Sequence, residues 1–390
     1  MKTHLPVALR KALLAAIVAV SAFAYNKADA AVVIALPDPD QKTLVEGLAD
    51  SSADIMAADD GQIEIINGTR AGSSNSVTWK DIKNDTLDFF SDELNDKVTS
   101  VSLLSAFNGE GNTVQTGDAS ITAEAGVGGS QNTLETVGGD IEVTTVSGSG
   151  NKLIASGDGS VNVGLVQGDH TSISTKNGNV SIQNVAVAAG KDYQESLEVS
   201  SSSGSVTVGV SEALLHDVKI DVGGTLTLGG DTAGRKEVLS LRGYGDDSNL
   251  LDGNAEITTH IKADGGITVN QSLLFSPGMD NNEQDDKLAH LTNKGRSVME
   301  SAGEIKFLGA TTEIVGGNNG SGSSPIDTTV SGSSISFKNA DGTDISQDVV
   351  VKSTVGSISI QDGEGAVNIS GVLNSAEDIY IHGGVVQIAS

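Results

Sequence analysis

The 390-residue chain contains no cysteine, five prolines and only 3% aromatic residues. Without cysteine it cannot use disulfides, which normally hold together exported domains that have poor cores. The scarcity of aromatic rings argues against a large globular core, because each ring buries about 150–250 Å². Stability must therefore come from sheet hydrogen bonds and from small aliphatic side chains stacked in a regular way.

Positive charge is also scarce, since 23 Lys and Arg residues face 51 Asp and Glu residues and the formal net charge is −28. A surface of this sign repels phosphate backbones and anionic lipids. The composition therefore disfavours nucleic acid and membrane surfaces as partners. The acids are spread singly along the chain, which is typical of a solubilising surface.

The N-terminus predicts a secretory signal peptide over residues 1–30. A basic start is followed by the apolar stretch Ala12–Ala24, which is too short to span a membrane. Ala28 and Ala30 then form an A-x-A cleavage site, with Ala31 as the first mature residue. We expect an exported protein, and no later stretch is apolar enough for membrane insertion by this chain.

Glycine is abundant, with 48 residues, and many of these glycines lie between the units of a sequence repeat. Pairs of aliphatic residues separated by one residue recur at spacings of 20, 20, 19, 26 and 20 residues in the first half of the repeat. Alternation predicts half-buried strands, and the recurrence predicts one repeated supersecondary unit. The pairs are Ile121/Ala123, Ile141/Val143, Val161/Val163, Val180/Ile182, Val206/Val208, Leu226/Leu228, Ile267/Val269, Ile305/Phe307, Ile335/Phe337, Ile358/Ile360, Val367/Ile369 and Ile379/Ile381.

A second aliphatic ladder lies seven to nine residues upstream of the first, at Leu134, Leu153, Ile173, Leu197 and Val218. Glycine-rich corners separate the two ladders, and we expect positive φ angles there. Two short strands and a corner in about 20 residues make one coil of a solenoid. The sequence therefore predicts an all-β fold, a parallel β-helix over residues 111–390 with rungs of about 20 residues.

Two regions break the repeat. Residues 31–110 are predicted to form a mixed, partly helical N-terminal cap, because Phe90, Leu94 and Val98 have helical spacing; residues 61–70 are a candidate early rung. Residues 229–300 are predicted to carry loop insertions, with 276–297 as a protruding loop. The sequence stops within strand-like alternation, so we expect either a truncated product or an end that another chain covers.

Catalytic signals are weak. The best cluster is Arg242, Asp246, Asp247 and Asp252, which could serve polysaccharide cleavage, although an Asp/Asn/Gly-rich stretch of this kind is far more commonly an ordinary turn. The GDGSV stretch at 157–161 resembles a nucleophile turn only superficially, since the same slot recurs in other rungs. No metal or phosphate motif is present in the required context. We expect no catalysis and no cofactor.

The residue between the two aliphatics of each pair should point outward, and most of these residues are Ser, Thr or Asn. Stacked rungs would align them as a hydrogen-bonding column able to meet another such column or a glycan chain. An ordinary solvated strand face is the alternative. Glu142, Lys306 and Tyr380 occupy the same slot, and the candidate adhesive residues are Thr122, Asn162, Ser181, Thr207, Thr227, Thr268, Ser336, Ser359 and Asn368.

The signal peptide, the acidic cysteine-free body and the imperfect G-[DSN]-hydrophobic-x-hydrophobic rungs resemble the passengers of bacterial autotransporters. Filamentous haemagglutinin-type exoproteins are similar. The resemblance covers residues 111–390 and implies a right-handed parallel β-helix at or beyond a Gram-negative cell surface. It also implies export through an outer-membrane translocator, and a role in adhesion, self-aggregation or biofilm formation with host glycans, host proteins or further copies as partners.

Three features of autotransporters and related exoproteins are missing from this sequence, and their absence limits the kind of protein that we expect. The sequence contains no C-terminal translocator barrel, no N-P-N signature of two-partner secretion and no G-D-S-G protease motif. We therefore expect an autotransporter-like passenger without its barrel. Three hypotheses stay open: an adhesin, a carbohydrate-active β-helix enzyme, and a passive stalk for a distal binding region.

Overall fold

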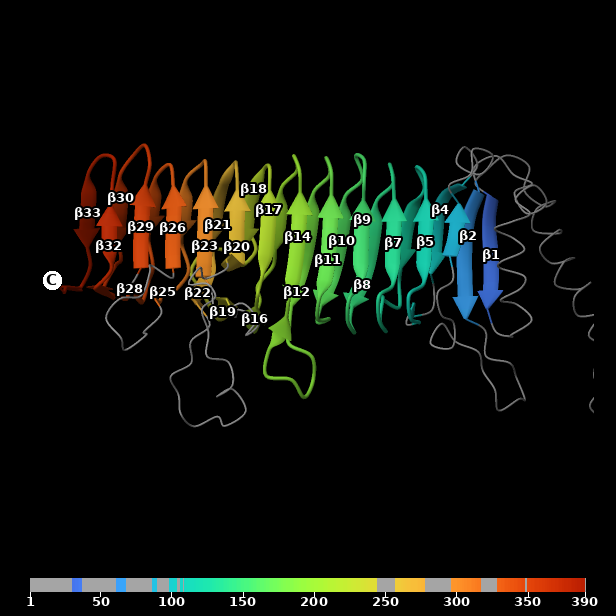
Figure 1. Cartoon of the computed structure of the whole chain (residues 1–390), viewed down its shortest axis with the longest axis horizontal. Helices are drawn as coiled ribbons and strands as arrows, with labels where there is room; N and C mark the ends of the chain where they lie inside the picture. The colour runs from blue at the N-terminus through green and yellow to red at the C-terminus, as the bar shows by residue number, and fades with distance from the viewer. Residues whose placement is uncertain are drawn as a thin grey trace, which may run out of the picture.

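The computed structural model describes residues 30–36, 61–67, 86–89, 98–103, 106–107, 109–243, 257–277, 296–316, 328–347 and 349–389. Within these residues the chain forms strands and no helix, and every strand pairing is parallel. The strands make three sheets of 14, 12 and 8 members that run side by side along the rod in Figure 1. The fold is a right-handed parallel β-helix, as the sequence predicts.

The first sheet runs the length of the rod and contains 14 strands in the order β1 (Ala30–Leu36), β2 (Gly61–Asn67), β4 (Val98–Leu103), β6 (Ser120–Ala123), β8 (Ile141–Val146), β10 (Val161–Val166), β12 (Val180–Val185), β15 (Val206–Val208), β18 (Thr225–Leu228), β21 (Gly266–Val269), β24 (Ile305–Phe307), β27 (Ile335–Phe337), β30 (Ile358–Gln361) and β33 (Ile379–His382).

The second sheet contains 12 strands, β3 (Thr86–Phe89), β5 (Thr113–Thr116), β7 (Thr133–Thr136), β9 (Lys152–Ala155), β11 (Thr171–Thr175), β14 (Leu197–Ser201), β17 (Lys219–Val222), β20 (Ile257–Ala263), β23 (Arg296–Ser301), β26 (Thr328–Gly332), β29 (Val349–Ser353) and β32 (Val372–Asn374). The third sheet contains eight, β13 (Gln194–Glu195), β16 (Ala213–His216), β19 (Arg235–Gly243), β22 (Gln271–Pro277), β25 (Thr311–Ile314), β28 (Gly342–Ile345), β31 (Ala366–Ile369) and β34 (Val385–Ile388).

The number of strands per coil changes along the rod. In the early coils of the repeat, strands of the second and first sheets alternate; the third sheet begins at β13. The wide spacing between Leu228 and Ile267 is a single coil, because β18 pairs directly with β21. The extra residues of this coil include β19 and residues 244–256, which lie outside the described residues.

The interior is filled by aliphatic side chains that stack on their equivalents in neighbouring rungs. Ile121, Ile141 and Val161 are fully buried and follow one another in register. The few buried rings also stack, with the centroids of Phe307 and Phe337 4.6 Å apart. A narrow core of this kind needs few aromatic residues, which agrees with the composition.

The N-terminal segment differs from the sequence prediction. The early rung expected over 61–70 is present as β2. The helical spacing of Phe90, Leu94 and Val98 predicts a helix within residues 77–98. This prediction is wrong for Thr86–Phe89, which forms β3, because the stretch alternates polar and apolar residues with the period of a strand. It is also wrong for Val98, which begins β4. Since β1 to β4 belong to the first two sheets, the solenoid extends N-terminal to residue 111.

Several other predictions lie wholly or largely outside the described residues. They include residues 1–29 of the signal peptide, residues 90–97 of the expected helix and residues 278–295 of the expected loop. Pro277 ends β22 and Arg296 begins β23 on either side of that loop.

Apart from Gly266, which has a φ of 121°, the glycine corners between the second and first sheets do not use positive φ, contrary to the prediction. Gly138, Gly139, Gly159 and Gly178 all lack it. Glycine is needed at these corners because there is no room for a side chain. A Cβ on Gly159 would lie 1.7 Å from the Gly139 carbonyl oxygen of the rung below. Glycine is therefore selected at this corner by the close approach of successive backbones.

The opposite corner is held by buried asparagines. The Asn112 N–H donates to Asn132 Oδ1 at 3.0 Å, and the Asn132 N–H donates to Asn151 Oδ1 at 2.9 Å. The Asn132 amide also donates to the Gly128 carbonyl. These side chains continue the hydrogen-bond ladder through a turn where the sheets are interrupted. A bond of the same kind occurs at another turn near the other end, between β27 and β28, where the Asn339 N–H donates to Asp362 Oδ1 at 3.0 Å.

Replacing Gly159 with alanine should lower the melting temperature and destabilise the protein by about 1–3 kcal/mol, because the new methyl overlaps the backbone of the adjacent rung. Thermal unfolding followed by circular dichroism measures the effect. Gly363→Ala is the matched control, since a Cβ there meets no atom within 4 Å. Equal melting temperatures for the two variants would contradict the steric explanation.

Replacing Asp362 with asparagine should stabilise the protein at pH 7 by about 1 kcal/mol. Burial raises the pKa of the Asp362 carboxyl, so ionisation of this group opposes folding. The folded state binds the proton more tightly, and the stability of the native protein therefore falls as pH rises through the raised pKa. Denaturant titrations at pH 4 and pH 7 should show a gain that shrinks in acid; a constant gain would argue against this cause.

Candidate functional site

The outward residues of the first sheet form one continuous column across successive rungs. We call this the flank column, and all its members are exposed or half-buried. The pairing register places them directly beside one another, and they are Thr122, Glu142, Asn162, Ser181, Thr207, Thr227, Thr268, Lys306, Ser336, Ser359 and Tyr380. The adhesive role assigned to them from sequence stays a prediction.

Asn368 does not belong to the flank column. It lies on β31 of the third sheet, where its Cα partners are Asp344 and Gln387. The stretch from Val367 to Ile369 alternates apolar and polar residues in the same way as a first-sheet strand. The sequence pattern alone therefore could not show to which sheet Asn368 belongs. Ser102 was missed from sequence, although it lies between Val101 and Leu103 and pairs with Thr122.

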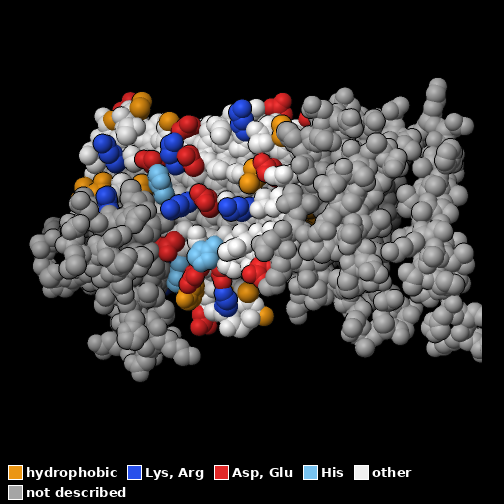
Figure 2. All heavy atoms as spheres, turned by 45° about the vertical axis from the view of Figure 1, so that its right-hand side comes forward, with side chains coloured by type: hydrophobic (Ala, Val, Ile, Leu, Met, Phe, Trp, Pro, Cys, Tyr) orange, Lys and Arg blue, Asp and Glu red, His pale blue; other side chains and the backbone are white. Residues whose placement is uncertain are grey.

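Charge is nearly absent from the middle of the flank column. Glu142 and Lys306 stand at either side of five consecutive uncharged rungs, Asn162 to Thr268. The outward face of the second sheet is different, because Glu198 pairs with Lys219 and Asp221 pairs with Lys262 across its rungs. Basic and acidic side chains also lie intermixed on the face drawn in Figure 2. A neutral strip on a strongly acidic protein can approach another acidic surface with less repulsion.

One edge of this face is fixed by side chains that extend the backbone ladder. Asp140 Oδ1 accepts the Ser160 N–H at 2.7 Å, and Ser160 Oγ accepts the Asn179 N–H at 3.1 Å. Asn179 Oδ1 then accepts the Ser205 N–H at 2.8 Å. This role explains the Asp, Ser or Asn that follows glycine in these rungs. The serine of GDGSV is Ser160, so its hydroxyl has a structural partner shared with neighbouring rungs.

The candidate catalytic residues are not brought together within the described residues. Arg242 lies on β19, whereas Asp246, Asp247 and Asp252 lie outside them. Two histidines contact single carboxylates: His170 Nε2 lies 3.4 Å from Glu195 Oε2, and His260 Nε2 lies 3.0 Å from Glu300 Oε1. No cluster of three metal-ligating residues occurs in the described part of the chain. The same residues contain no helix that could cross a membrane.

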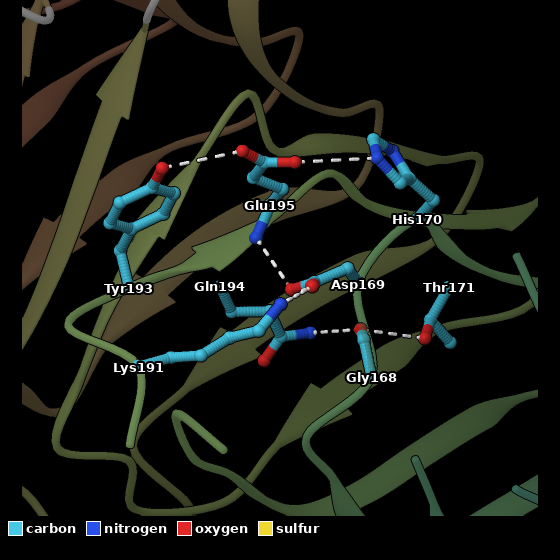
Figure 3. A network of polar contacts seen from close by, with 8 residues as sticks. All are labelled: Gly168, Asp169, His170, Thr171, Lys191, Tyr193, Gln194 and Glu195. Carbon is cyan, nitrogen blue, oxygen red and sulfur yellow. Dashed lines mark hydrogen bonds and ion pairs between the residues drawn. The ribbon is translucent and has the colours of Figure 1, made fainter. Parts of the chain in front are cut away.

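A polar network that the sequence analysis missed lies where the third sheet begins (Figure 3). Asp169 pairs with Lys191 and accepts the Glu195 N–H at 3.1 Å. Gln194 is buried and its amide donates to the Gly168 carbonyl at 2.7 Å. These contacts tie residues 186–195 to the preceding rung. The partners are 22 and 26 residues apart, so no local motif marks the network.

His216 lies beside this network on β16, with only 4% of its surface exposed. Its ring stacks on Tyr193, with centroids 4.0 Å apart. Burial, and then the positive charge of Arg242, lower the pKa of His216 to about 3. The imidazole is therefore neutral at physiological pH and behaves as a packing group of the third sheet.

The fold places the chain in the class of parallel β-helix solenoids, and the described face is a polar surface on a rigid rod. Comparison with protein-family models, with curated proteins and with solved structures finds no match for this chain.

His216→Phe should remove part of the pH dependence of stability between pH 6.5 and pH 5. In the wild type, His216 is protonated in the unfolded state within this pH window but stays neutral in the folded state. The free energy of unfolding therefore falls as pH drops through the window. The expected slope is about 1.4 kcal/mol for each pH unit. Denaturant titrations compare the two proteins, and an identical slope for both would show that His216 takes up its proton in the folded state.

Proposed function

We propose that this chain is an exported, non-catalytic adhesive rod that binds through the flank column. The observation that carries the proposal is the register of the first sheet, which aligns hydroxyl and amide side chains over successive rungs. The predicted signal peptide and the resemblance to autotransporter passengers support a place at or beyond a Gram-negative cell surface, reached through an outer-membrane translocator.

The flank column suits adhesion because its groups repeat at a fixed interval. Parallel strands lie about 4.8 Å apart, so the column offers evenly spaced donors and acceptors. Each hydrogen bond contributes only about 0.5–1.5 kcal/mol net. Several formed together give useful affinity, since the solenoid already holds the backbone in place and little ordering cost remains.

Three acidic substitutions in the neutral strip, Thr207→Asp, Thr227→Asp and Thr268→Asp, should reduce adhesion about tenfold or more, because they place charge where a neutral surface docks. Beads coated with the purified exported protein can be scored for binding to each other, to epithelial cells and to glycan arrays. Ser174→Asp, Ser200→Asp and Ser331→Asp form the matched control, since these residues occupy half-buried outward positions on the second sheet.

The outcomes decide between the open hypotheses. Loss of adhesion in the flank variant alone supports the proposal. Equal adhesion by both variants and the wild type would place the binding surface outside the flank column and reject the proposal. Wild-type beads that bind none of the targets would count against an adhesive role and would favour a passive stalk.

A further inference from the structure

We propose that the partner of the flank column is a second copy of this chain, packed antiparallel about a twofold axis that runs along β15. This inference rests on the proposed function and adds the identity and geometry of the partner. The evidence is the placement of charge on the first sheet, which is self-complementary about that one strand.

The first pair of charges lies in the flank column itself. In the order of the first sheet, Glu142 on β8 is three strands before β15, and Lys306 on β24 is three strands after it. A twofold axis along β15 exchanges these two positions. Glu142 of one copy therefore faces Lys306 of the other, and the contact occurs twice in the dimer.

A second pair obeys the same axis independently. Glu124 follows β6 and Lys338 follows β27, and each of these strands is four strands from β15. Both side chains are exposed, and both residues continue the parallel ladder, with N–H groups donating to the carbonyls of Leu103 and Phe307. They lie in the outward column next to the flank column, so the axis brings Glu124 opposite Lys338.

The same charges exclude the parallel arrangement. If two flank columns met with their rods pointing the same way and in register, Glu142 would face Glu142 and Lys306 would face Lys306, which is repulsive. Moving the twofold axis to β12 would place Glu142 opposite Thr227, and moving it to β18 would place Glu142 opposite Ser359. Both of these residues are uncharged, so either move would break the charged pairs. The β15 axis is the one that satisfies both.

Between the charged pairs the two faces would meet through small polar groups. Thr207 lies on the axis and faces its own copy, while Ser181 faces Thr227 and Asn162 faces Thr268. The adjacent outward column includes Gly164 and Gly209, which carry no side chains. Two such faces can approach closely while keeping hydroxyl and amide groups paired.

The β15 axis also creates one kind of like-charge contact, because it places Asp140 of one copy opposite Glu304 of the other. Each of these two carboxylates already has a partner in its own chain. Asp140 accepts the Ser160 N–H, and Glu304 lies 3.0 Å from Lys306 and accepts the Ser336 hydroxyl at 3.3 Å. Asp140 and Glu304 lie in a third outward column, and the twofold axis repeats every contact. The balance over the three columns still favours the antiparallel dimer, with four opposite-charge contacts against two like-charge ones.

Charge reversal tests the arrangement with two variants. Glu124→Lys with Glu142→Lys makes one, and Lys306→Glu with Lys338→Glu makes the other. Sedimentation velocity over a concentration series should show a wild-type dimer and at least about tenfold weaker self-association for each variant. An equimolar mixture of the two variants should dimerise again, because in the mixed dimer all four contacts at the substituted positions are between opposite signs.

A cross-linking experiment tests the axis directly, since the chain has no cysteine of its own. Thr207→Cys should join to its own copy through a short thiol cross-linker. Thr122→Cys should join to Ser336→Cys in a mixture and not to itself, because these residues are four strands from β15 on opposite sides. Circular dichroism of each variant checks that the fold is retained.

Results that would overturn the inference differ from those against the proposed function. A wild-type monomer at every concentration, a mixture that fails to dimerise, or self-linking of Thr122→Cys would each reject the twofold partner. Adhesion of beads to cells or glycans, abolished by the threonine-to-aspartate variant, would still support the adhesive face. The reverse combination, a dimer without any adhesion by beads to cells, would leave self-association as the whole of its binding.

Discussion

The hydrogen bond between the backbones of successive rungs is the interaction on which this structure depends. Parallel pairing fixes both the spacing of the rungs and their register, so a residue type repeated at one position becomes a column on the surface or in the core. The same bonds explain how a chain with few rings and no disulfides can fold: each rung is a template for the next, and small aliphatic side chains suffice inside.

Corners are where the backbone ladder would fail, and the chain solves this in two ways. At one corner glycine lets successive backbones come close, and Asp140, Ser160 and Asn179 supply side-chain oxygens for the next N–H group. At the opposite corner Asn112, Asn132 and Asn151 do so from inside the coil. The polar residues of the repeat are thus part of the scaffold, which is why so few of them indicate chemistry.

Sequence reasoning predicted the coil and most of the flank column because both follow from strict alternation at a near-constant spacing. It failed where alternation is shared by different sheets, as at Asn368, and where helical and strand periods overlap over a few residues, as at Thr86–Phe89. The third sheet and the network around Asp169 also escaped prediction. Their contacts join residues about one coil apart, and a changed number of strands per coil leaves no local signal.

Because the rungs are evenly spaced, the number of rungs between two residues sets the distance between them along the rod. In the proposed antiparallel dimer, each charged contact depends on the number of rungs that separate Glu142 from Lys306. One extra rung between β8 and β24 would move Lys306 by one step relative to Glu142. Two copies that both carry the extra rung could still pair, about an axis between two strands. An original copy and a lengthened copy could form only one of the two Glu142–Lys306 contacts at a time, so the proposed contact would select partners with the same number of coils.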